Sequence, residues 1–215
     1  MRVEPAAALR GRLRKDETET ATELGYNQEV RRKLLHLFAL SIPVGYHFVP
    51  LLAAILIPFG CFAFSLTADL ARFRGWAVQR LWRRWTDSII RPKERCNFTG
   101  ATNILASGWL CPLLFVRPAA ALGMSAIILG DVAAALVGRR WGKHRYRNDR
   151  SFEGSAAFLV AAAVGSLLVP GVPIGIALTA ALLGAVVEGF SKRVDDNLTV
   201  PLIVGLYVHL ALRVL

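Results

Sequence analysis

The sequence is poor in cysteine: Cys61, Cys96 and Cys111 are the only three among 215 residues, and they form no C-x-x-C pair. An odd, dispersed set argues against a disulfide framework or a cysteine-based metal site, so we interpret these residues as small apolar side chains. Residues 1–30 contain no apolar run of the kind found in a cleavable signal peptide. The basic stretches match no recognised DNA- or RNA-binding motif, and nucleic acid is therefore not an expected partner.

Acidic residues are also scarce, because 15 Asp and Glu stand against 26 Lys and Arg, for a net charge of +11. The chain is nevertheless 54% apolar, with a mean hydropathy of +0.45. Its charges lie in blocks between long apolar runs, which is typical of an integral membrane protein. The positive charge therefore indicates an anionic membrane face and anionic substrates.

Seven apolar runs come near the ~20 residues that a helix needs to cross the hydrocarbon. They cover residues 34–49, 51–70, 98–115, 119–137, 152–169, 174–190 and 198–214. With the N-terminus in the cytoplasm, every Lys and Arg except Arg117 and Arg213 falls on the cytoplasmic side, as the positive-inside rule requires. We predict an all-α protein of the cytoplasmic membrane with about seven transmembrane helices, a cytoplasmic N-terminus and a cytoplasmic active face.

Two polar segments complete the expected organisation. Residues 1–30 are interpreted as a cytoplasmic tail, and residues 31–215 as one membrane-embedded domain. Residues 72–85, between the second and third runs, place tryptophans and aliphatic side chains on one helical face and most arginines opposite. This pattern predicts an amphipathic helix in the headgroup region, with a charged loop as the alternative.

The densest polar cluster is DVAAALVGRRWGKHRYRNDRSFEG at residues 131–154. Asp131 ends an apolar run, and the small residues Ala134, Gly138 and Gly142 follow at four-residue spacing. That spacing by itself is typical of helix packing. An acid at the end of a membrane helix is, however, a functional candidate, and it is followed here by several cations and a second acid. Cations suit phosphate oxygens, whereas carboxylates suit Mg²⁺ or a hydroxyl proton.

Polar residues also stand at the ends of other runs. Asp195, Asp196 and Asn197 begin the last run, where capping of the helix and a functional role are compatible. The third run begins with residues 99–103, whose polar side chains either line a cavity or bond to neighbouring helices. His36 alone is more typical of a packed histidine than of a ligand.

Five motifs together resemble the polyprenol kinase family, which includes dolichol kinases, phytol kinases and CTP-dependent diacylglycerol kinases. They are Arg32-Lys33-x-x-His36, Phe98-Thr99-Gly100-Ala101, Asp131-x-x-Ala134-x-x-x-Gly138-x-x-x-Gly142-Lys143, Ser151-x-Glu153-Gly154 and Asp195-Asp196-Asn197-Leu198-Thr199-Val200-Pro201. The resemblance extends from about residue 31 to the end of the chain. The middle motif also resembles the CDP-diacylglycerol synthases. Those enzymes typically carry a His-Gly-Gly-rich signature that this chain lacks, which favours the kinase interpretation.

The resemblance implies transfer of a γ-phosphate, typically from CTP, to the hydroxyl of a membrane lipid or isoprenoid alcohol: polyprenol, a phytol-like alcohol or diacylglycerol. It implies Mg²⁺ as the cofactor. The expected catalytic residues are Asp131 and Glu188, and the expected metal ligands are Asp131, Glu153, Asp195 and Asp196. The expected nucleotide-binding residues are Arg32, Lys33, Gly138, Arg139, Arg140, Gly142, Lys143, Ser151, Glu153 and Gly154. The expected substrate pocket contains His36, Thr99, Thr102, Asn103 and Asn197.

Two alternatives stay open at this point. One is a CTP-using enzyme similar to phosphatidate cytidylyltransferases, and the other is a transporter or membrane scaffold without enzymatic activity. The sequence leaves the identity of the alcohol, the choice of nucleotide and the oligomeric state open, and a homo-oligomer is compatible with it.

Overall fold

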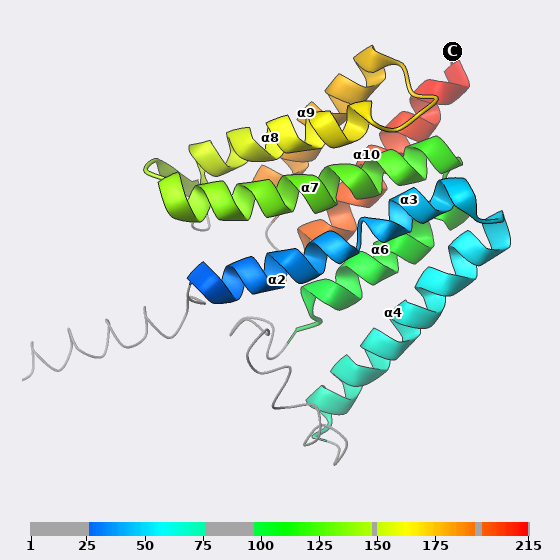
Figure 1. Cartoon of the computed structure of the whole chain (residues 1–215), viewed down its shortest axis with the longest axis horizontal. Helices are drawn as coiled ribbons and strands as arrows, with labels where there is room; N and C mark the ends of the chain where they lie inside the picture. Colours follow the sequence, from blue (N-terminus) through cyan, green and yellow to red (C-terminus); the bar gives the residue numbers. More distant parts are fainter. Residues whose placement is uncertain (1–25, 76–96, 148–149, 192–194, 215) are drawn as a thin grey trace, which may run out of the picture.

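The structure, a computed structural model, describes residues 26–75, 97–147, 150–191 and 195–214, and helices make up most of this part of the chain (Figure 1). The helices are α2 (Tyr26–Phe38), α3 (Ser41–Phe48), α4 (Leu51–Phe73), α6 (Gly100–Leu114), α7 (Arg117–Trp141), α8 (Phe152–Leu167), α9 (Ile174–Phe190) and α10 (Asp196–Val214). The predicted all-α class is therefore confirmed. An unpredicted antiparallel hairpin of β1 (Arg145–Arg147) and β2 (Arg150–Ser151) lies within the basic loop.

The first apolar run, expected as a single helix, is divided between α2 and α3. Backbone bonds from Ala39 to His36 and from Leu40 to Leu37 tighten the chain after α2, and the Ser41 hydroxyl donates to the Phe38 carbonyl at 2.8 Å. The break separates a charged helix from an apolar one. The predicted tail lies outside the described residues as far as residue 25, and α2 begins at Tyr26.

Membrane-spanning capacity differs among the described helices. α4, α7 and α10 are long and apolar enough to cross a bilayer, whereas α8 and α9 are apolar but have 16 and 17 residues. Many large apolar side chains on these helices are exposed, including Leu52, Ile57 and Phe64 of α4. These features support a membrane protein. The number of spans and their orientation stay predictions.

Helix α7 occupies the centre of the bundle, between the α8–α9 pair and the α2–α3 pair, with α10 packed against it (Figure 1). Every residue from Ala119 to Ile128 is buried. The far end of α7 is only partly buried and carries Asp131 and Arg139. One helix thus supplies both the apolar core and the polar end of the molecule.

Glycines on α7 allow its neighbours to approach closely. A Cβ on Gly123 would lie 2.5 Å from the Pro201 carbonyl oxygen of α10, and a Cβ on Gly130 would lie 2.7 Å from the Phe158 ring of α8. Real Cβ atoms do not reach such distances, so a side chain at either position would push the helices apart.

Helix α4 lies at the edge of the bundle and packs mainly against α6 (Figure 1). Phe59 and Phe62 pack against Trp109, and the Asp69 carboxylate accepts bonds from Thr99 and Thr102 at the start of α6. The predicted interfacial helix lies outside the described residues, apart from its first four residues, which end α4 and form a turn.

Replacement of Gly123 by Ala tests the close approach of α7 and α10. Because the new methyl group would collide with backbone, we expect a loss of about 1–3 kcal/mol in the free energy of unfolding. The measurement is the melting temperature of the purified protein in detergent. Gly60→Ala on α4 is the matched control, since nothing lies within 4 Å of the position that a Cβ at residue 60 would occupy. Equal melting temperatures for the two variants would contradict the close contact.

Candidate functional site

A buried ion pair joins α2 to α7. The Lys33 ammonium group, 1% exposed, donates to Oδ2 of Asp131, although the two residues are 98 positions apart in the sequence. His36, one turn further along α2, places Nε2 3.5 Å from the same carboxylate oxygen. The two motifs that were predicted to share one site therefore meet in space.

Glu29 also belongs to this group, although no sequence motif indicated a role for it. Its side chain is fully buried, and its carboxylate accepts a bond of 2.6 Å from Arg32 and lies 3.7 Å from a guanidinium nitrogen of Arg139. Its spacing of three residues from Arg32 and four from Lys33 places all three on neighbouring positions of one helix. The spacing within α2 could have indicated Glu29 from the sequence, but it does not identify Arg139 of α7 as a second partner.

A second group forms around Arg150 of β2, which was not among the predicted site residues. One guanidinium nitrogen lies 2.8 Å from Oε1 of Glu188 on α9, and the other donates to Oδ2 of Asp196 on α10 at 2.9 Å. The second oxygen of Glu188 is buried and has no hydrogen-bond partner within the described part of the chain. Arg150 thus ties the hairpin to the ends of two helices.

Asp195 caps α10, as its position in the sequence suggested. Its Oδ1 accepts from the backbone N–H of Asn197 at 3.0 Å and from the Asn197 side-chain amide at 2.7 Å. Ser107 of α6 donates to the Asn197 carbonyl at 2.8 Å. These bonds fix the start of α10, and with it the position of Asp196.

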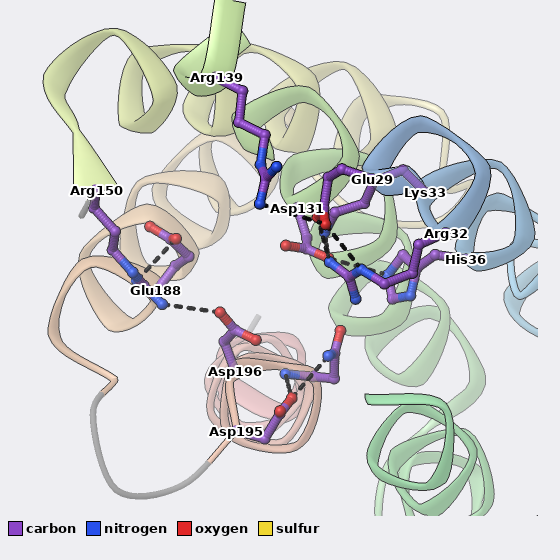
Figure 2. Close-up of polar contacts among 11 residues, drawn as sticks. Glu29, Arg32, Lys33, His36, Asp131, Arg139, Arg150, Glu188, Asp195 and Asp196 are labelled. Atoms are coloured by element: carbon purple, nitrogen blue, oxygen red, sulfur yellow. Dashed lines mark hydrogen bonds and ion pairs between the residues drawn. The ribbon is translucent and has the colours of Figure 1, made fainter. Parts of the chain in front are cut away.

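The Lys33–Asp131 group and the Arg150 group face a common region (Figure 2). The carboxylates of Asp131, Asp196 and Glu188, from α7, α10 and α9, are gathered around it (Figure 2). Like charges that share a region repel one another, and a bound cation would relieve this repulsion.

Two carboxylates that face this region, Asp131 and Asp196, are the candidate ligands for a metal ion (Figure 2). Among the described residues, no three His, Cys, Asp or Glu side chains are placed to hold a metal ion by themselves. Mg²⁺ usually takes one or two carboxylates together with phosphate oxygens and waters, and Asp131 and Asp196 match this requirement. Glu153, also predicted as a ligand, pairs with Nδ1 of His144 at 2.8 Å, and its part in metal binding stays a prediction.

The predicted glycines lie at the contact between α7 and α8. A Cβ on Gly138 would lie 3.2 Å from the Ser151 hydroxyl oxygen, and a Cβ on Gly154 would lie 3.1 Å from the Ala134 carbonyl. Ser151 caps α8 by accepting from the Gly154 N–H at 3.0 Å, and Gly142 ends α7 beside it. Helix packing explains these small residues, and their nucleotide-binding role stays a prediction.

The other predicted residues lie in different surroundings. Arg140 and Lys143 are exposed, and the Arg140 guanidinium lies 5.3 Å from the Trp141 ring centre. Thr99 and Thr102 bond to Asp69 at the α4–α6 joint. Asn103 is half-buried, and its carbonyl accepts from Ser107 at 3.3 Å. Their parts in binding nucleotide or alcohol stay predictions.

Comparison with known proteins gives distant relatives, while no family model and no solved structure matches the chain. The chain is 29% identical to an uncharacterized protein of Rickettsia prowazekii over 82% of this chain and 91% of the relative. It is 38% identical to a phytol kinase of Synechocystis over 39% of this chain and 40% of the kinase. It is 28% identical to CTP-dependent diacylglycerol kinase 1 of Schizosaccharomyces pombe over 65% of this chain and 68% of that enzyme.

These partial similarities support a family relationship with membrane lipid kinases, and hence an enzyme of the kinase type at the family level. They agree with the resemblance that the motifs indicated. The substrate of this chain does not follow from them.

Replacement of Arg150 by Gln tests its structural part in the site. The change leaves the Glu188 and Asp196 carboxylates without this cation, so we expect a loss of about 2–3 kcal/mol in the free energy of unfolding. Removing the charge of Glu188 as well, in an Arg150→Gln/Glu188→Gln variant, should restore part of that loss. Melting temperatures in detergent provide the measurement.

Arg145→Gln is the control for the Arg150 variant, because it removes an exposed arginine from the same hairpin. We expect it to change the free energy of unfolding by less than about 0.5 kcal/mol. A similar loss in both variants would show that Arg150 has no special structural part.

Proposed function

We propose that this protein is a CTP-dependent kinase that transfers the nucleotide γ-phosphate to the hydroxyl group of a membrane lipid or isoprenoid alcohol. The observation that carries the proposal is the meeting of Lys33, Asp131, Arg139 and Asp196 from α2, α7 and α10 in one region (Figure 2). The kinases named among the relatives support the same class of reaction.

Arg32, Lys33 and Arg139 are the proposed phosphate-binding residues. Each has a carboxylate partner: Arg32 and Arg139 approach Glu29, and Lys33 binds Asp131. A triphosphate would therefore be received by cations that are already held in place, which lowers the entropy lost on binding. Asp131 and Asp196 would hold Mg²⁺ together with phosphate oxygens. The ion would neutralise the phosphate charge.

The proposed reaction places the alcohol oxygen in line with the γ-phosphorus and the oxygen that bridges to the β-phosphate. The alcohol oxygen forms the new P–O bond, the bridging P–O bond breaks, and CDP leaves. The hydroxyl proton passes to a carboxylate, for which Asp131 and Glu188 are the candidates. Glu188 offers a buried oxygen without a hydrogen-bond partner in the described chain, whereas Asp131 is bound to Lys33.

The proposed acceptor enters from the bilayer, on the ground that two helices that carry the site expose apolar side chains, including Leu34 and Leu35 of α2 and Ile203 and Leu206 of α10. We also propose that the site faces the cytoplasm, on the ground that the Lys and Arg residues of the chain concentrate on that side of the expected topology.

A label-transfer assay tests the proposal. Purified protein in detergent is supplied with CTP labelled in the γ-phosphate, Mg²⁺ and, separately, a polyprenol, phytol, diacylglycerol and phosphatidic acid, the last as the acceptor that a cytidylyltransferase requires. Label in a lipid monophosphate is the expected result. Label that appears only in pyrophosphate would indicate a cytidylyltransferase, and no turnover with any alcohol would contradict the kinase proposal.

Asp131→Asn is the negative control for that assay. The change removes the charge that binds Lys33 and that is proposed to hold Mg²⁺, so we expect phosphorylation to fall by at least about 100-fold. Membrane insertion, measured by extraction and by gel filtration in detergent, should be retained. Full activity in this variant would refute the central part of the proposal.

Arg139 and Arg140 form a matched pair of neighbours for testing the phosphate contacts. Arg139 points to the buried carboxylate of Glu29, whereas Arg140 is exposed and lies over Trp141. We expect Arg139→Gln to raise the KM for CTP by about tenfold, through the loss of a charged contact of about 1.4 kcal/mol. Arg140→Gln should raise it by less than about threefold, and the reverse order would move the phosphate site to the exposed side of α7.

A further inference from the structure

We propose that Glu29 is a positioning residue that holds Arg32 and Arg139 in the geometry that receives the nucleotide phosphates. The inference rests on the proposed nucleotide-binding function of this site. None of the sequence motifs had indicated a role for Glu29.

The burial of Glu29 requires compensation. Its side chain is fully buried, and a carboxylate removed from water is destabilised strongly unless it is paired and hydrogen-bonded. Arg32 supplies a two-point contact, because its Nε lies 3.3 Å from Oε2 of Glu29 and its terminal nitrogen lies 2.6 Å from Oε1. This fork geometry fixes the plane of the Arg32 guanidinium as well as its position.

Glu29 also acts between two helices. Its Oε2 lies 3.7 Å from a terminal nitrogen of Arg139, so one anion on α2 is shared by a cation of α2 and a cation of α7. Two guanidinium groups brought together without such an anion would repel each other. Glu29 therefore allows two arginines from separate helices to contact one carboxylate, and guanidinium groups gathered in this way suit the oxygens of a phosphate.

The two arginines are held to different degrees. The contact of Glu29 with Arg32 is short and two-pointed, whereas its contact with Arg139 is longer and involves one nitrogen, and the Arg139 side chain is 28% exposed. A guanidinium group carries five N–H donors, so Arg139 can keep its contact with Glu29 and still donate to a phosphate. We infer that Glu29 acts on nucleotide affinity mainly through the orientation of Arg139.

A purely structural part for Glu29 makes a different prediction. If the carboxylate only fastened α2 to α7 through Arg139, its loss would weaken CTP binding only as far as it lowers the melting temperature, and Arg139→Gln would lower that temperature to the same extent. A double-mutant cycle in CTP affinity measures whether Glu29 acts through Arg139, and the melting temperatures of the same proteins separate orientation of Arg139 from fastening of the helices.

The experiment measures the equilibrium binding of CTP with Mg²⁺ to the full-length protein in detergent. The four proteins are the wild type, Glu29→Gln, Arg139→Gln and the double variant. We expect Glu29→Gln to weaken binding about tenfold in the wild-type background and less than about twofold in the Arg139→Gln background. Glu29→Asp, which keeps the charge, should recover part of the affinity, and it replaces Glu29→Gln in the cycle if that variant does not fold.

Asp69→Asn is the matched structural control. Asp69 is also a buried carboxylate paired with an arginine three residues later, at 2.8 Å from Arg72, but it lies at the α4–α6 joint. We expect this variant to melt at a lower temperature and to bind CTP within about twofold of the wild type.

The outcomes separate this inference from the proposed function. Affinity losses that simply add in the cycle, or unchanged CTP binding in Glu29→Gln, would overturn the positioning role of Glu29. A wild-type protein that does not bind CTP would overturn both proposals. A wild-type protein that binds CTP with the expected coupling, but phosphorylates no alcohol, would overturn the kinase function alone.

Discussion

The buried ion pair between Lys33 of α2 and Asp131 of α7 is the contact on which the polar end of the molecule depends. A lysine that is 1% exposed is destabilised unless an anion accompanies it, and Asp131 is correspondingly held by the cation. The pair therefore fixes the position of α2 against α7. Because Glu29 and His36 lie on neighbouring turns of α2, they are carried to the same end of α7.

A second constraint comes from the small residues of α7. Gly123 and Gly130 bring α10 and α8 close to the central helix, and Gly138 does the same at the start of α8. These contacts determine where the ends of the neighbouring helices lie. They thereby place Arg150 beside Glu188 and Asp196, opposite the carboxylate of Asp131 (Figure 2). The glycines that the motifs associated with nucleotide binding thus have a packing role that a sequence motif alone does not distinguish.

The helical class and several members of the site were predictable from the sequence. Long apolar runs predict helices, and the acid that ends one of them, Asp131, marked the polar end of α7. The division of residues 34–49 into α2 and α3 was not predicted, because the stretch was interpreted as one apolar run, although Ser41 and Pro43 at the start of α3 are ordinary signals for the beginning of a helix. Glu29 and Arg150 were missed because their roles depend on residues far away in the chain. Glu29 contacts Arg139, whereas Arg150 contacts Glu188 and Asp196.

The sequence by itself determined that the chain is helical and apolar, that its charges are gathered in blocks, and which motifs resemble those of lipid kinases. The periodicity and composition of a segment act locally, so these properties needed no knowledge of the fold. The tertiary structure decided which charges pair: Lys33 with Asp131, Glu29 with two arginines, and Arg150 with two acids. Ion pairing depends on distance and burial, and these follow from how closely the helices pack around α7.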